Sequence, residues 1–296
     1  MKLNQTATSL YFYPEQSSQR RLAALACFAT LITIWTIAGH LVLGFEQSYA
    51  QPVIAALTGV GITLLFEWLR AWAVDEPPRF ATGWPNLLST ILPGVITGLA
   101  VGMLLYPGER LIPIVFAVVL SIASKVLVRV PVGKTSQHIF NPSNFGITVT
   151  LFLFPSVGLA PPYHFTENII GWGNWLLPAG ILASGIVIHS FFTGRLPLCL
   201  AWILAFVGQA LIRSVIFNLS IVALLMPMTS AAFVLFTLYM IPDPATTPVN
   251  TRRQVAFGVA VAVTYGLILS LHIVFGLFLS LFCMSAVRGI LLYRRR

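Results

Sequence analysis

Acidic residues are scarce in this 296-residue sequence, which contains eight Asp and Glu against 17 Lys and Arg. Charged residues make up only 8% of the chain, far below the roughly 25% of soluble domains. Hydrophobic residues make up 57%, and the mean hydropathy is +0.89. This deficit of charge excludes an ordinary soluble domain and predicts an all-α integral membrane protein surrounded by a lipid bilayer.

Cysteine is also rare, and Cys27, Cys199 and Cys283 stand in three separate apolar runs. The sequence has no CxxC pair, so we expect neither a disulfide framework nor a metal cluster held by this chain alone. His189 and His272 are expected on opposite membrane surfaces, with no second ligand at metal-binding spacing. A Ser-His-Asp set and paired catalytic carboxylates are also missing, so electron transfer would require a bound cofactor.

Apolar runs fill most of the chain, and about ten spans of about 20 residues fit into it. The run from Val255 to Leu292 would be roughly 57 Å long as one helix, so we expect it to fold back at His272. The expected spans are Leu22–Leu43, Pro52–Ala73, Leu87–Tyr106, Leu111–Val128, Asn144–Ala160, Trp172–Phe192, Leu196–Phe217, Ile221–Ile241, Val255–Ser270 and Ile273–Leu292. They form a single membrane domain over 21–293, with halves 21–165 and 168–293, an N-terminal tail at 1–20 and a basic end at 294–296.

The cations indicate topology rather than nucleic-acid binding, because no soluble basic domain exists to hold a nucleic acid. With ten spans and a cytoplasmic N-terminus, every Lys and Arg except Arg110 and Arg213 lies on the inner side. The first apolar run is too long for a signal-peptide core, so we interpret it as a retained helix. Both termini are therefore expected in the cytoplasm and the protein in the cell (inner) membrane.

Two pairs of charges stand at helical spacing. Glu67 and Arg70 are three residues apart and are predicted to form an ion pair near the inner end of the second span. Lys125 and Arg129 are four residues apart on one helical face, so they cannot neutralise each other. Their counter-charge would be a bound anion, a carboxylate such as Asp243, or lipid phosphate.

The stretch from Gln137 to Pro155 contains the clearest motif. Asn141 is predicted to cap a helix whose first residue is Pro142, the position where a missing N–H is harmless. The free N–H groups of that helix would lie beside Lys125, Arg129 and Lys134 and could hold an anion.

A second proline motif, from Asp243 to Pro248, ends the eighth span on the same side. A turn with Asp243 as its hydrogen-bond acceptor explains most of the pattern. The two motifs could also form two walls of one site. The candidate cofactor-binding residues are Lys125, Arg129, Lys134, Asn141, Ser143, Asn144, Asp243, Thr246 and Thr247.

The ends of the third and eighth spans also echo each other. Leu104-Leu105-Tyr106-Pro107 and Tyr239-Met240-Ile241-Pro242 lie five spans apart and in opposite directions. This arrangement is what an inverted five-plus-five repeat requires, although chance similarity between apolar segments is common.

These segments carry a family resemblance. Lys125, Phe140–Asn144 and Tyr239–Pro248 resemble the membrane subunits NqrB and RnfD of the sodium-pumping NADH:quinone oxidoreductase and the Rnf electron-transport complex. The resemblance runs from about Asn86 to Arg288. Segments 160–168, 193–197 and 243–248 are more similar still to the divergent UnbU-like branch, identified with enediyne biosynthesis.

The resemblance implies a ten-helix inverted-repeat fold, similar to urea transporters, and a role in flavin-dependent membrane electron transfer with separate redox subunits. NqrB and RnfD carry a Ser-Gly-Ala-Thr type segment whose Thr is linked to FMN, between the fifth and sixth spans. Here that connection contains Thr166 in Thr-Glu-Asn and no such motif. We therefore expect a flavin (FMN or riboflavin) or a quinone to bind noncovalently. A transporter or channel for a small solute or ion, and a scaffold subunit, are the alternatives.

Overall fold

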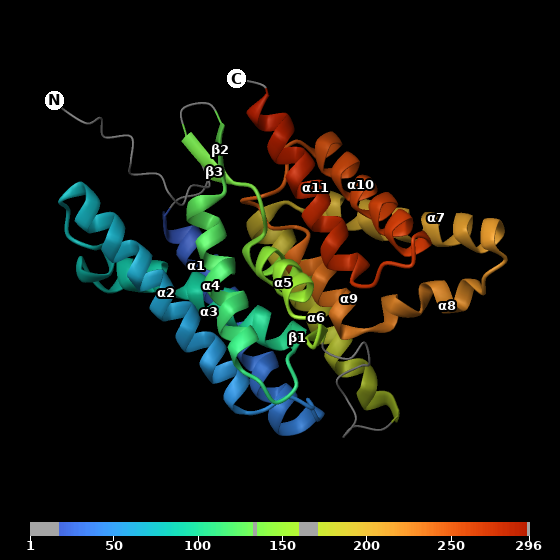
Figure 1. Cartoon of the computed structure of the whole chain (residues 1–296), viewed down its shortest axis with the longest axis horizontal. Coiled ribbons are helices and arrows are strands. Elements are labelled where there is room, and N and C mark those ends of the chain that lie inside the picture. Colours follow the sequence, from blue (N-terminus) through green and yellow to red (C-terminus); the bar gives the residue numbers. More distant parts are fainter. Residues whose placement is uncertain (1–17, 133–134, 160–170, 295–296) are drawn as a thin grey trace.

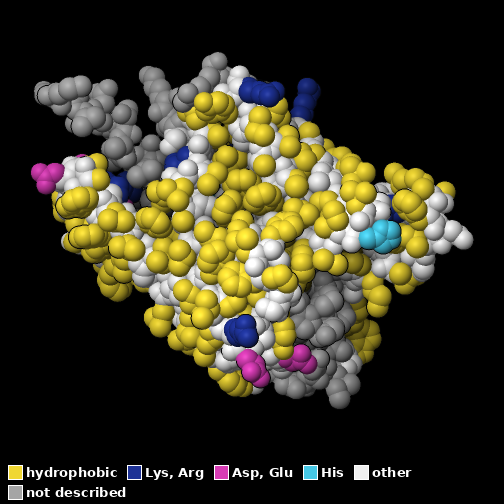
Figure 2. Space-filling view, viewed as in Figure 1, with side chains coloured by type: hydrophobic (Ala, Val, Ile, Leu, Met, Phe, Trp, Pro, Cys, Tyr) yellow, Lys and Arg dark blue, Asp and Glu magenta, His cyan; other side chains and the backbone are white. Residues whose placement is uncertain are grey.

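The computed structural model describes residues 18–132, 135–159 and 171–294, and nearly all of its long elements are helices (Figure 1). Seven helices are long and apolar enough to cross a membrane, or eight if one bent pair counts as a single span. Hydrophobic side chains cover most of the face in Figure 2, and the few charged ones lie near its margins. The chain is a multi-pass, all-α membrane protein.

The described residues of the first half contain five α-helices, one short π-helix, one short 3-10 helix and four short strands. Its elements are α1 (Ser18–Ala38) with a π-helical extension η2 (Gly39–Leu43), α2 (Ala50–Val74), η3 (Arg79–Ala81), α3 (Trp84–Leu104), β1 (Leu105–Tyr106), α4 (Ile112–Leu127), β2 (Arg129–Val132), β3 (Thr135–His138), α5 (Pro142–Leu153) and β4 (Gly158–Leu159).

In the second half, all regular elements among the described residues are helices. Its elements are η4 (Gly171–Trp175), α6 (Leu176–Ile188), η5 (His189–Thr193), α7 (Leu196–Phe217), α8 (Ile221–Leu225), η6 (Met226–Thr229), α9 (Ala231–Leu235), η7 (Phe236–Met240), α10 (Thr251–Ser270) and α11 (Gly276–Tyr293).

Glycine allows a close helix contact between α2 and α3. A Cβ placed on Gly59 would lie 2.2 Å from the carbonyl oxygen of Gly94, and one on Gly98 would lie 2.2 Å from that of Ala55. Small residues let membrane helices pack backbone against backbone, where van der Waals contact replaces the hydrophobic effect. The backbones of α2 and α3 therefore lie in direct contact at these glycines.

Two short antiparallel strand pairs connect the helix ends. In β1–β4, Leu105 pairs with Leu159, which ties the end of α3 to the segment after α5. Gln51 of α2 donates to the carbonyl oxygens of Gly102 at 2.6 Å and Leu105 at 3.0 Å. In β2–β3, Arg129 pairs with His138 and so returns the chain to the start of α5.

Three expected spans are not among the seven long apolar helices. The fourth forms α4, whose 16 residues are fewer than the roughly 20 of a span. The fifth was expected to reach Ala160, but α5 ends at Leu153, two residues before Pro155. Its 12 residues are roughly 18 Å long, less than the hydrocarbon thickness. The eighth is broken between α8 and α9, whose helical segments are bent by 69°. Pro227 lacks an N–H, and Ser230 accepts from Phe233 N at 3.1 Å to cap a new helix.

Three local predictions are confirmed. The last apolar run folds back at His272, which has a φ of 59°. Asn141 caps α5, and Pro142 is its first residue. Arg70 Nη2 lies 2.7 Å from Glu67 Oε1, and this carboxylate also accepts from Arg79 N at 3.1 Å.

Candidate functional site

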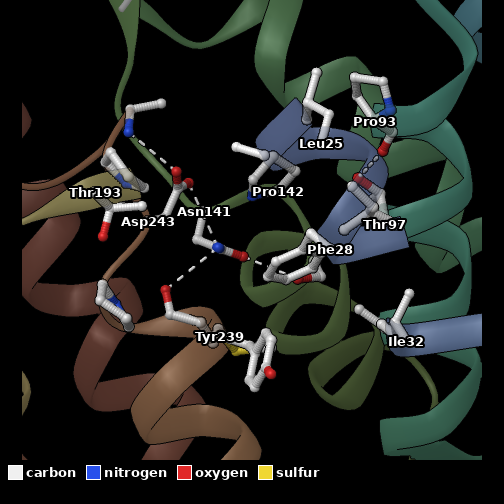
Figure 3. Close-up of a pocket in the computed structure, with 18 of the residues that line it drawn as sticks. Leu25, Phe28, Ile32, Pro93, Thr97, Asn141, Pro142, Thr193, Tyr239 and Asp243 are labelled. Atoms are coloured by element: carbon white, nitrogen blue, oxygen red, sulfur yellow. Dashed lines mark hydrogen bonds between the residues drawn. The ribbon is translucent and has the colours of Figure 1, made fainter. Parts of the chain in front are cut away.

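A cavity of about 260 Å³ lies between α1, α3, α4, the start of α5 and the end of η7 (Figure 3). Its apolar part includes side chains of α1, among them Leu25, Phe28 and Ile32. Its polar part includes the cations Arg21, Lys125 and Arg129 together with Gln137, His138, Asn141 and Asp243. The cavity is therefore amphipathic, with mostly cationic charge in its polar part.

Asn141 joins the two proline motifs. Its Oδ1 accepts from Asn144 N at 3.1 Å and from Ser143 Oγ at 2.9 Å, as a helix cap does. Its Nδ2 donates to Met240 O at 3.3 Å and to Asp243 Oδ2 at 3.5 Å, across 102 positions of sequence. Figure 3 shows the Asn141 and Asp243 side chains pointing toward each other. The same amide thus shapes the start of α5 and holds the Asp243 turn.

The Asp243 turn is held by its own hydrogen bonds. Ala245 N donates to Asp243 Oδ1 at 3.0 Å, and the hydroxyl of Thr247 donates to Asp243 O at 2.6 Å. Arg195 Nε donates to Thr247 Oγ1 at 3.2 Å from the other side. The turn explanation for this motif is therefore confirmed, and the Thr246 and Thr247 hydroxyls serve the turn itself.

The cations at the polar end are held in place. Lys125 Nζ donates to Thr97 Oγ1 of α3 at 3.1 Å. Arg129 Nη1 donates to Lys125 O at 2.8 Å, and its Nε donates to Ser136 Oγ at 3.0 Å within the β2–β3 hairpin. The hairpin thus fixes the Arg129 guanidinium at the wall of the cavity.

Burial changes two pKa values at this end. The pKa of His138 falls to about 3, because burial and then the charges of Lys125, Arg129 and Arg288 disfavour the imidazolium. His138 is therefore neutral at pH 7. Burial raises the pKa of Asp243, while the Ala245 N–H and the charges of Lys125 and Arg195 act in the opposite direction.

The cavity brings together some predicted residues and not others. Those that line it are Lys125, Arg129, Asn141, Ser143 and Asp243. Asn144, Thr246 and Thr247 are buried but are not among the described residues that line it. Lys134 lies outside the described residues.

Sequence reasoning missed several lining residues. Arg21 and Thr97 lie on two different helices, and no local pattern relates them to the two motifs. Tyr239 belongs to the family-like segment Tyr239–Pro248 but was not among the candidate site residues. His189 also lines the cavity; it is 4% exposed, and its Nδ1 lies 2.6 Å from Thr193 Oγ1. Helix α6 continues as the π-helical η5, which turns this imidazole toward Leu238 O.

The described lining offers hydrogen-bond donors, cations, one carboxylate and aromatic rings. These groups suit binding and orientation of a ligand with an apolar part and an anionic part. A scan against protein-family models finds no match, and a search of curated proteins finds no significant match. The functional proposal therefore depends on the geometry of this cavity and on the motif resemblance.

Proposed function

We propose that this protein is a membrane subunit of an electron-transport system, similar in role to NqrB and RnfD, that binds a flavin noncovalently in the cavity. The observation that carries the proposal is the pair of hydrogen bonds from Asn141 to Met240 and Asp243, because they unite the two family-like motifs at one cavity. A bound flavin would accept and release electrons reversibly, chemistry that side chains do not supply.

The lining fits such a ligand. Phe28 and Tyr239 offer aromatic surface at the apolar part, where a flavin ring would pack. Arg21, Lys125 and Arg129 offer cations for an FMN phosphate. The start of α5, with its macrodipole, adds a further attraction for an anion.

We propose that the chain crosses the inner membrane ten times as an inverted five-plus-five repeat. Both termini then lie in the cytoplasm. Helix packing supports this repeat, because three contacts within the first half have counterparts in the second half. The α1–α3 contact corresponds to the α6–α9 contact, the α2–α4 contact to the α7–α10 contact, and the α4–α5 contact to the α10–α11 contact. Arg21 and His138 line one cavity, and Gly289 lies against Ile139. The start of α1 and the end of α11 are consequently near the same hairpin.

The spectrum of the purified protein tests the flavin proposal. We expect a visible flavin band after supplementation with FMN, and acid precipitation should release the flavin into the supernatant. In Lys125→Met, FMN affinity should fall by roughly tenfold or more because a charge-assisted hydrogen bond is lost. Arg110→Met, at an exposed cation outside the cavity lining, should bind FMN as the unmodified protein does.

Two outcomes contradict this proposal. One is an absence of any flavin band after both FMN and riboflavin supplementation. The other is equal FMN affinity in the Lys125 and Arg110 variants, which would place the flavin away from the cavity.

Transport of a small solute is a second candidate, favoured by the broken eighth span. The bent α8–α9 pair continues into η7, whose Leu238, Tyr239 and Met240 line the cavity. Transporters place substrates at discontinuous helices between repeats. In sealed vesicles, a transporter would move a solute down its gradient with a flux that falls in Asn141→Ala, whereas a redox subunit would show no protein-dependent flux.

A further inference from the structure

The cavity is elongated along two helices. Its lining residues on α1 recur every three or four positions, as one helical face requires, and are Arg21, Ala24, Leu25, Phe28, Ile32 and Trp35. Those on α3 recur in the same way and are Pro93, Ile96, Thr97, Ala100, Met103 and Leu104. These two stripes extend roughly 21 Å and roughly 16 Å along their helices. Figure 3 shows Leu25, Phe28 and Ile32 following one another along α1. The cavity is therefore long, and its volume of about 260 Å³ makes it narrow.

The two stripes run in the same direction. Gln47, shortly after η2, donates from Nε2 to the carbonyl oxygens of Met103 at 3.1 Å and Leu105 at 3.3 Å. The end of the α1–η2 helix consequently lies beside the end of α3. The last lining residues of both stripes are then at one end of the cavity, and the first ones, with Arg21, are at the other.

The two ends of the cavity differ in polarity. Arg21 begins the α1 stripe, and Lys125 donates to Thr97 Oγ1 within the first half of the α3 stripe. Arg129 also lines the cavity and is held beside Lys125 by its bond to Lys125 O. The opposite end is lined by apolar side chains, which are those of Ile32, Trp35, Ala100, Met103, Leu104 and Leu235. The cations therefore lie at one end and the hydrocarbon side chains at the other.

Packed aromatic side chains bound the apolar part. A Cβ added to Gly180 of α6 would overlap the Trp35 indole ring, so this ring lies directly against the α6 backbone. Phe28 and Tyr239 meet edge to face, with ring centroids 4.9 Å apart. Met103 is only 3% exposed. The apolar part thus has defined walls and a defined end.

This shape fits one extended hydrocarbon chain that carries an anionic head. Lipid tails are as apolar as the side chains of the cavity, so a chain gains little by leaving the bilayer for it. Selection must then come from the head group, and carboxylates and phosphates form strong charge-assisted hydrogen bonds with Lys and Arg. The narrow apolar part favours a lipid with one chain over a lipid with two.

We propose that the cavity binds a single-chain anionic lipid, with its head at Lys125 and Arg129 and its chain extended between α1 and α3 toward Trp35. This inference does not require a flavin. An FMN phosphate would use the same cations, so the lipid and FMN would compete for the cavity.

Photolabelling of the full chain in phosphatidylcholine nanodiscs, without added flavin, tests the inference. The probes are hexadecyl phosphate and hexadecanoate with a diazirine near the end of the chain, and the matching hexadecanol as the uncharged counterpart. Mass spectrometry of peptides locates the labels. We expect saturable labelling of Trp35 or Met103 by at least one anionic probe and no saturable labelling there by hexadecanol.

Two variants and a matched control sharpen the test. Ala100→Phe places a ring in the apolar part, and Lys125→Met removes a cation from the head site, so each should reduce this labelling roughly tenfold or more. Ala23→Phe places the same ring on the exposed side of α1, next to the lining residue Ala24, and should leave the labelling unchanged. If Ala100→Phe does not fold, Ala24→Phe should give the same loss.

The outcomes are separable from those of the flavin test. Labels confined to exposed residues such as Leu57 and Leu204, equal labelling in Ala100→Phe and Ala23→Phe, or saturable labelling by hexadecanol would overturn the inference. Saturable labelling of Trp35 or Met103 supports it even where no flavin band appears. Labelling that added FMN does not reduce would contradict the flavin proposal alone.

Discussion

Replacing Asp243 by Asn should destabilise the folded protein by about 1–3 kcal/mol, because the Ala245 N–H and the Asn141 amide lose a charged acceptor, an effect that the burial of the carboxylate offsets in part. Lys125, Arg195 and Arg288 would then interact with no acidic side chain at the turn. The amide is the same size as the carboxylate and can still accept from Ala245 N, so the loss reports charge rather than shape.

The control for this prediction is Glu109→Gln, which removes a carboxylate from an exposed loop. Exposed ion pairs contribute at most about 1 kcal/mol, so this variant should unfold close to the unmodified protein. Chemical or thermal unfolding in one detergent gives both values. Equal stability of the two variants would show that the charge of Asp243 does not stabilise the turn.

Gly59→Leu should prevent stable folding or cost at least about 3 kcal/mol, because the α2–α3 contact cannot accommodate a side chain there. The new Cβ would lie 2.2 Å from the carbonyl oxygen of Gly94 and 2.9 Å from its carbonyl carbon. Both are backbone atoms of a helix, so neither can move without separating α3 from α2.

The same helix supplies a matched control. Gly61 is exposed, and a Cβ added there meets nothing within 4 Å. Gly61→Leu should therefore give normal amounts of monodisperse protein on size exclusion and an unchanged unfolding midpoint. Similar behaviour of the two leucine variants would mean that α2 and α3 do not pack as closely as described.

Sequence reasoning succeeded where the signal is local. The cap at Asn141, the ion pair from Glu67 to Arg70 and the turn at His272 each depend on residues within a few positions. The break of the eighth span also had a local signal, since Pro227 and Ser230 form a stop followed by a helix cap. The continuous hydrophobicity of 221–241 outweighed that signal in the span prediction.

The site could be predicted only in part. The two proline motifs were considered as walls of one site because each should lie on the same membrane side, and the structure joins them through Asn141 and Asp243. The partnership of Lys125 with Thr97, and the approach of Arg288 to the same turn, depend on how whole helices pack. No spacing along the chain encodes such contacts.

The short α5 has a consequence for the main chain that follows it. A helix of roughly 18 Å is shorter than the hydrocarbon core, so the peptide groups that follow Leu153 need partners other than water. The β1–β4 pair supplies such partners, and the Gln51 amide holds the carbonyl groups of Gly102 and Leu105 on the α3 side of that pair. The ends of α3 and α5 are thereby held in register, so a one-residue deletion in either helix would misalign this two-stranded sheet.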